Sequence, residues 1–205
     1  MSETRNQLLS KVRKITEALP DRTPLPDTRE VAALKSRLVP NANDEATLAA
    51  TFAKRWKEAS GLLLESVADL KTFLKAENVG DGYIDPSVLP MLGIEELAGA
   101  RTEYDRARVD AIQFGITRAS LGVAETGTVV LKDRVTSNRL AALAPWVHIA
   151  VLKKSEIVAT LGDAVAQFGD DPSIVFVTGP SKTADIEGIL IEGVHGPGRQ
   201  AVLLV

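Results

Sequence analysis

The apolar positions of this chain recur with two periods, one typical of helices and one typical of strands. Leu48, Phe52 and Trp56 lie four residues apart, which predicts a helix that begins at Asn43 or Asp44. Short runs of apolar and β-branched residues have the length and composition of strands, often buried ones. The main predicted strands are residues 62–64, 83–84, 111–117, 122–132, 147–152, 174–178 and 201–205.

Further helices are predicted where a capping residue precedes apolar positions at helical spacing. Ser66 begins one such helix, and Ser155 begins another that carries Ile157, Val158 and Leu161 and ends at Gly169. The order strand, helix, strand between residues 61 and 84 implies a parallel pair of strands. We therefore expect an α/β fold with a mainly parallel sheet flanked by helices.

Residues 1–42 are expected to form an N-terminal helical extension of the α/β domain, which would span residues 43–205. A first helical seam contains Leu8, Val12, Ile15 and Leu19, and a proline-rich hinge at residues 20–27 separates it from a second short helix. Two helices of this length are not stable alone. They either cover a face of the sheet or form an arm that contacts a partner, including a second copy of the chain.

Composition narrows the chemistry that these elements can support. The 205 residues contain no cysteine and only two histidines, His148 and His195. Cysteine-ligated iron–sulfur clusters, thiolate nucleophiles and multi-histidine zinc sites are therefore excluded, and we expect no metal site. No glycine pattern of the dinucleotide-binding type occurs, so we expect no cofactor.

Charge and hydropathy indicate the setting in which the chain works. A net charge of −3 gives no reason to expect nucleic-acid binding. The longest apolar runs are far too short to span a bilayer, and the first residues lack the apolar core of a secretory signal. We therefore expect a cytoplasmic protein.

The first candidate site follows the apolar run 174–178. Gly179 and Pro180 end that run, and Ser181, Lys182 and Thr183 come next. In an open α/β sheet, ligands bind beyond the carboxyl ends of the strands, and amides, hydroxyls and a lysine suit a small anion. The segment is not a Walker A loop, and Pro180 removes one amide donor. The alternative is a structural turn that Ser181 caps.

Two further polar residues lie close to this turn in sequence. Asp185 either accepts hydrogen bonds from the amides of the turn or positions a substrate hydroxyl or a cation. His195 is followed by Gly196 in a glycine-rich loop, where it could act as an acid, base or donor or could bond a neighbouring turn. The other histidine, His148, lies in an apolar run and is expected to be structural.

The second candidate segment of the site is the turn formed by Glu125, Thr126, Gly127 and Thr128, which interrupts a strand-like run. The alternative is a hairpin turn in which Gly127 supplies a positive φ. If both turns belong to one site, the ligand-binding residues would be Thr126, Gly127, Thr128, Gly179, Ser181, Lys182, Thr183 and Gly196. The catalytic candidates would be Glu125, Asp185 and His195.

Four segments together resemble the LUD-domain family of lactate-utilisation proteins, in particular its C subunits. They read AETGT (residues 124–128), PWVHIAV (145–151), GPSKTADIE (179–187) and GVHGPGR (193–199). The resemblance implies the fold of glucosamine-phosphate isomerase, ribose-phosphate isomerase and the CoA transferases. It also implies a role in the oxidation of L-lactate to pyruvate beside iron–sulfur partner proteins. It transfers no assigned active site.

Three hypotheses therefore remain open from the sequence. The chain is a subunit of a lactate-oxidising system that binds a small anionic ligand between the two turns. Alternatively, it is a stand-alone enzyme of the phosphosugar-isomerase or acyl-transferase type that uses Glu125 or Asp185 with His195. In the acyl-transferase version, Glu125 could form an acyl ester. As a third alternative, it is a non-catalytic scaffold whose N-terminal helices bind the partners.

Overall fold

The computed structural model describes residues 4–17, 33, 37, 39, 44–184 and 190–205. The chain divides into two compact units, Met1–Leu34 and Lys35–Val205. In the first unit, α1 (Arg5–Glu17) is the predicted N-terminal helix, and none of its residues is buried. Leu19 and most of the second short helix lie outside the described residues, and the expected boundary at residue 42 stays a prediction.

A six-stranded sheet of parallel strands forms the centre of the second unit, in the order β1-β12-β7-β4-β2-β3. This confirms the expected α/β fold with a mainly parallel sheet. The strands are β1 (Leu62–Leu64), β2 (Gly82–Ile84), β3 (Ala100–Arg101), β4 (Phe114–Arg118), β7 (Val147–Leu152) and β12 (Arg199–Leu204).

The expected pairing of the two strands between residues 61 and 84 is wrong. β1 and β2 run parallel in the same sheet, but β12, β7 and β4 lie between them. The reason is that β7 and β12 are the long apolar strands, with almost every residue buried, so they occupy the centre.

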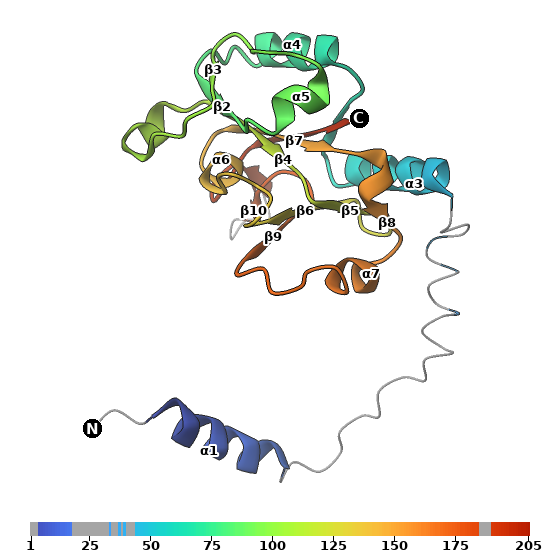
Figure 1. The fold of residues 1–205 in the computed structure, drawn as a ribbon, viewed down its shortest axis with the longest axis vertical. Coiled ribbons are helices and arrows are strands. Elements are labelled where there is room, and N and C mark those ends of the chain that lie inside the picture. Colours follow the sequence, from blue (N-terminus) through green and yellow to red (C-terminus); the bar gives the residue numbers. More distant parts are fainter. Residues whose placement is uncertain (1–3, 18–32, 34–36, 38, 40–43, 185–189) are drawn as a thin grey trace. The chain divides into compact units, whose positions relative to one another are not determined.

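Alternate residues of β7 face two different cores, one on each side of the sheet. Val147, Ile149 and Val151 belong to the cluster that contains buried residues of α4 (Val67–Ala76) and α5 (Val88–Leu92). Ala150 and Leu152 belong to the opposite cluster, with α3 (Glu45–Glu58) and α6 (Leu140–Leu143). Figure 1 shows α4 and α5 on one side of the sheet and the strands of a second sheet on the other.

The helix α3 forms as its sequence predicts. The Asp44 carboxylate caps it by accepting from the backbone N–H of Thr47 at 2.8 Å. Phe52 and Trp56 are fully buried in the cluster beneath the sheet, and Val39 joins the same cluster with 1% of its surface exposed.

The second sheet has four strands in the order β8-β5-β6-β9, and it corrects one expectation. The run 174–178 was expected to be a buried strand of an open parallel sheet. Instead, β9 pairs antiparallel with β6, and Phe176 is 47% exposed because one face of this edge strand is open to solvent. The strands are β5 (Leu121–Val123), β6 (Thr128–Lys132), β8 (Ile157–Val158) and β9 (Ile174–Val177).

The helix expected to begin at Ser155 is also wrong in its first half. Ile157 and Val158 form β8 because they complete a ladder beside Gly122 and Val123 of β5. A 3₁₀ turn, η2 (Lys154–Glu156), precedes them, and Thr160 begins α7 (Leu161–Val165) with a capping box. The sequence also did not predict η1 (Arg106–Ala111) or the hairpin of β10 (Lys182–Ala184) and β11 (Leu190–Glu192).

Candidate functional site

The two turns predicted from the sequence are connected by a chain of hydroxyl groups. Thr126 Oγ1 lies 2.7 Å from Thr128 Oγ1, which in turn lies 2.8 Å from Thr178 Oγ1 at the end of β9. Thr128 is buried, and Thr126 is exposed. The antiparallel pairing of β6 and β9 therefore brings together two segments that are 50 residues apart.

Both turns pack on the C-terminal end of α3, and glycine permits the close approach. Gly127 and Gly179 have φ angles of 64° and 81°. A Cβ atom on Gly127 would lie 2.4 Å from the backbone nitrogen of Trp56, and one on Gly179 would lie 2.1 Å from the carbonyl oxygen of Ala59. The predicted positive φ at Gly127 is therefore confirmed.

Lys182 has partners within the chain at this place. Its ammonium group donates to Ser60 Oγ at 2.7 Å and lies 3.7 Å from a carboxylate oxygen of Glu192. The C-terminal end of a helix carries partial negative charge, so the end of α3 favours a cation there and disfavours an anion. The role of Lys182 as an anion ligand stays a prediction.

The other candidate residues near this turn differ in how closely they are held. The backbone N–H of Ser181 donates to the carbonyl of Pro197, and its carbonyl accepts from Gly193, so the turn is tied to the glycine-rich loop. Thr183 pairs with a residue of β11, and Gly196 lies against the Ser181 side chain. His195 is exposed. Asp185 lies outside the described residues, so both of its predicted roles stay predictions.

Glu125 holds the beginning of α7. Its Oε1 accepts a hydrogen bond of 2.7 Å from the backbone N–H of Leu161, the first residue of that helix. A carboxylate is stabilised there by the unsatisfied amide groups of the helix. This contact gives Glu125 a structural partner, and its role as a nucleophile stays a prediction.

A second polar cluster, which the sequence analysis missed, lies at the carboxyl edge of the six-stranded sheet. Asp85 directly follows β2 and is 1% exposed. Its Oδ1 accepts from the N–H and the hydroxyl of Ser87, at 2.9 and 2.6 Å, and its Oδ2 accepts from the N–H of Ser137 at 2.9 Å. Three donors thus hold a buried carboxylate in one position.

Two tyrosines extend this cluster. The Tyr83 hydroxyl bonds the Ser137 hydroxyl, and its ring meets that of Tyr104 edge to face at 5.4 Å between centroids. Burial raises the pKa of Tyr83, and the bond to Ser137 acts in the opposite direction. Burial likewise raises the pKa of Tyr104, against the effect of the nearby Arg106. Both phenols are therefore neutral at physiological pH.

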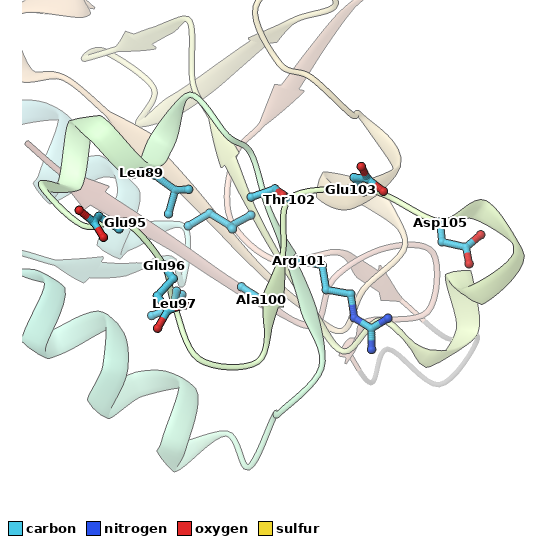
Figure 2. A pocket seen from close by; sticks show the side chains of 10 residues that line it. Leu89, Glu95, Glu96, Leu97, Ala100, Arg101, Thr102, Glu103 and Asp105 are labelled. Atoms are coloured by element: carbon cyan, nitrogen blue, oxygen red, sulfur yellow. The ribbon is translucent and has the colours of Figure 1, made fainter.

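An acidic cavity of about 590 Å³ opens at the ends of β2 and β3 (Figure 2). In the view of Figure 2, Glu95 and Glu96 lie toward one end of the cavity, and Glu103 and Asp105 lie toward the other. Arg101 lies between them but already pairs with Asp81 at 3.4 Å. An excess of carboxylates makes this cavity unsuitable for a small anion.

His148 lies fully buried in the centre of the sheet, which confirms its predicted structural role. Its Nδ1 donates to Gln200 Oε1 at 2.7 Å, and its Nε2 accepts from the Thr117 hydroxyl at 2.8 Å. These bonds satisfy both nitrogens of a neutral imidazole. Burial lowers its pKa from 6.5 to about 4.

Asp85 could have been identified from its position in the sequence. It is an acidic residue that directly follows a short apolar strand, where a parallel sheet places its polar residues. Ser137 carried no comparable signal, because it becomes part of the cluster only when the loop before α6 crosses the end of β2.

Within the residues that the structure describes, no group of three or more histidine, aspartate or glutamate side chains is arranged to hold a metal ion. Every helix in the same residues is too short or too polar to cross a bilayer.

A parallel six-stranded sheet flanked by helices defines an α/β protein. The model of the LUD domain matches residues 36–205, and the chain belongs to the LUD-domain family. A crystal structure of a DUF162 family protein from Deinococcus radiodurans is similar in fold. Its TM-score is 0.57 and its sequence identity is 22%, over 79% of this chain and 98% of that one.

Several curated relatives carry the name Lactate utilization protein C. The one from Bacillus subtilis is 38% identical over 111 residues, which are 50% of this chain and 46% of that protein. The one from Deinococcus radiodurans is 36% identical over 111 residues, which are 52% of this chain and 50% of that protein. The matches thus span about half the length of these curated relatives.

Proposed function

We propose that this chain takes part in lactate utilisation, as a subunit that supports the oxidation of L-lactate to pyruvate. The observation that carries the proposal is the match of the LUD domain to residues 36–205, together with relatives named Lactate utilization protein C. The chain has no cysteine with which to ligate an iron–sulfur cluster. The electrons of lactate oxidation are therefore taken up by iron–sulfur partner proteins, and the chain works with them in the cytoplasm.

The proposal includes a small anionic ligand and a distant relationship in fold. The parallel order of the six-stranded sheet supports kinship with glucosamine-phosphate isomerase, ribose-phosphate isomerase and the CoA transferases. A stand-alone acyl-transferase activity through Glu125 has weaker support, because that carboxylate accepts from the N–H of Leu161. The subunit role is therefore preferred over an independent enzyme.

A scaffold role is the second candidate, and the apolar stripe of α1 favours it. Leu8, Val12 and Ile15 recur at helical spacing along this helix. An apolar stripe of this kind is typical of a helix that packs on a partner. In this version the chain holds the iron–sulfur proteins together and binds no substrate.

The test is the formation of pyruvate from L-lactate in extracts of native cells with and without the chain. We expect extracts without it to lose most of this activity and to regain it when the purified chain and its partners are returned. Co-purification with metal analysis then checks the partners, and iron should accompany the chain only when they do. Equal pyruvate formation in both extracts would contradict the proposal.

A further inference from the structure

A second cavity, also of about 590 Å³, is lined by residues 137–140 with Arg106, Asp133 and Leu143. Its wall crosses the ends of two neighbouring strands of the six-stranded sheet, β4 and β2. The Thr136 hydroxyl donates to the carbonyl of Arg118, the last residue of β4, and the N–H of Ser137 donates to Asp85, directly after β2. The chain goes from β2 outward to β3 and returns to β4 on the other side of β2. Such reversals in strand order mark ligand sites.

Among the described residues, Arg106 has no counter-charge at this cavity. Tyr104, two residues before it in the chain, has a hydroxyl without an acceptor in those residues but does not itself line the cavity. Arg106 lines the cavity and forms no ion pair within the part of the chain that the structure describes. In the same part of the chain, the Tyr104 hydroxyl is the buried side-chain polar atom that has no hydrogen-bond partner. A buried hydroxyl in this state is destabilising unless something else supplies an acceptor.

The charges at the cavity select a monoanion. The guanidinium of Arg139 lies 2.7 Å from Asp133 Oδ1, so these two charges balance. The charge of Arg106 remains, and the lining therefore carries one net positive charge. A carboxylate with a single negative charge matches it, whereas a phosphate dianion leaves an excess charge and a metal cation is repelled.

The other residues that line the cavity indicate which further groups a ligand would carry beside its carboxylate. Leu140 and Leu143 are 36% and 43% exposed and offer an apolar wall to a short aliphatic group. Asn138 Oδ1 accepts from the N–H of Leu140 at 3.0 Å, which leaves the amide NH₂ of Asn138 as a donor. Next to it, the hydroxyl of Ser137 bonds that of Tyr83. These groups suit a polar oxygen beside the carboxylate.

We propose that this cavity binds a small monocarboxylate with a hydroxyl or oxo group on its second carbon, and that Arg106 binds the carboxylate. The site rests on the geometry described above, and the choice of a 2-hydroxy or 2-oxo acid rests on the proposed function. It lies apart from the turns that the sequence analysis identified, where the cation of Lys182 has partners within the chain.

The test is calorimetric titration of the purified full chain with L-lactate, pyruvate and inorganic phosphate in turn. We expect L-lactate or pyruvate to bind more tightly than phosphate. Arg106→Gln should weaken that binding roughly 10- to 100-fold, since it removes a charge-assisted hydrogen bond. The matched control Arg55→Gln changes an exposed arginine on α3 and should bind like the wild type. All variants should melt at wild-type temperatures.

The inference would be overturned if the chain bound neither acid, or if it bound phosphate more tightly than both. It would also be overturned if Lys182→Gln lost binding of the acids while Arg106→Gln bound them like the wild type. Failure here is distinct from failure of the proposed function. If cells need the chain for growth on L-lactate while the purified chain binds neither acid, only the inference fails. If binding follows the prediction while cells grow without the chain, only the proposed function fails.

Discussion

The backbone N–H of Ser137 donates to Asp85 Oδ2 over 2.9 Å, although 52 residues separate the two in the chain. This bond attaches the loop before α6 to the carboxyl end of β2. The loop carries Asn138 and Arg139, so the position of Asp85 determines where the wall of the proposed carboxylate site lies. Asp85 is thus a positioning residue.

Replacing Asp85 by alanine should lower the free energy of unfolding by about 2–4 kcal/mol, because Ser87 and Ser137 lose the acceptor of buried donors. Urea denaturation measures the change. Asp110→Ala is the control, since Asp110 is exposed, and it should stay within about 0.5 kcal/mol of the wild type. Equal effects of the two variants would show that the cluster does not hold the loop.

Acid should destabilise the protein through His148. Burial lowers the pKa of this histidine to about 4 in the folded chain, against 6.5 for the ordinary group. The folded state therefore binds fewer protons than the unfolded state between these values. The contribution of neutral His148 to the free energy of unfolding is fully present above pH 6.5. It is lost as the pH falls toward 4, by about 2–4 kcal/mol in all.

Denaturation at pH 7.5 and at pH 4.5 checks this for His148→Gln beside the wild type. The variant should lose less stability on acidification than the wild type, because it lacks the group that takes up a proton on unfolding. A His148→Gln slope equal to that of the wild type would contradict the account.

Alanine substitutions at Gly127 and Gly93 separate the cost of a steric clash with α3 from the cost of a positive φ alone. Gly127 and Gly93 both have φ of 64°, but a Cβ at Gly127 would lie 2.4 Å from the Trp56 nitrogen, whereas one at Gly93 meets nothing within 4 Å. Gly93→Ala should cost about 1 kcal/mol for its φ, and Gly127→Ala should cost at least about 2 kcal/mol more. Thermal melting of the two variants measures these losses of stability. Similar losses in both would mean that the turn at Gly127 does not pack on α3.

Tyr104→Phe should separate stability from binding. The change removes a buried hydroxyl that has no partner among the described residues, so the free energy of unfolding should rise by about 1 kcal/mol. Binding of pyruvate or L-lactate should stay as in the wild type, because Tyr104 is not among the residues that line the cavity. Denaturation and calorimetry on the same sample measure both. A less stable variant would show that the hydroxyl has a partner inside the folded chain.

Local patterns predicted the elements that depend on local chemistry. The cap at Asp44 and the spacing of Leu48, Phe52 and Trp56 predicted α3, and the apolar run 147–152 predicted β7. Pairing depends on contacts between distant residues, which no local pattern carries. Ile157 and Val158 fit a helix by their spacing, yet they form a strand because β5 offers a free edge to them. For the same reason, the sequence did not predict that β9 pairs antiparallel with β6.

The candidate site shows the same division. The motif residues at 125–128 and 179–183 were identified, and they meet through Thr128 and Thr178, but their packing on the end of α3 appears only in the folded chain. Arg106 was missed because an exposed arginine in a polar segment has no distinguishing pattern. It becomes a candidate only when Asp133 is found to neutralise Arg139 and leaves Arg106 without a counter-charge.

The central claim is that the chain supports the conversion of L-lactate to pyruvate, and growth of the native cell on each compound tests it most directly. A strain that lacks the chain should fail to grow on L-lactate as the sole carbon source and should grow normally on pyruvate, the product of the step. Returning the wild-type chain should restore growth on L-lactate. Growth on L-lactate at the wild-type rate without the chain would contradict the account.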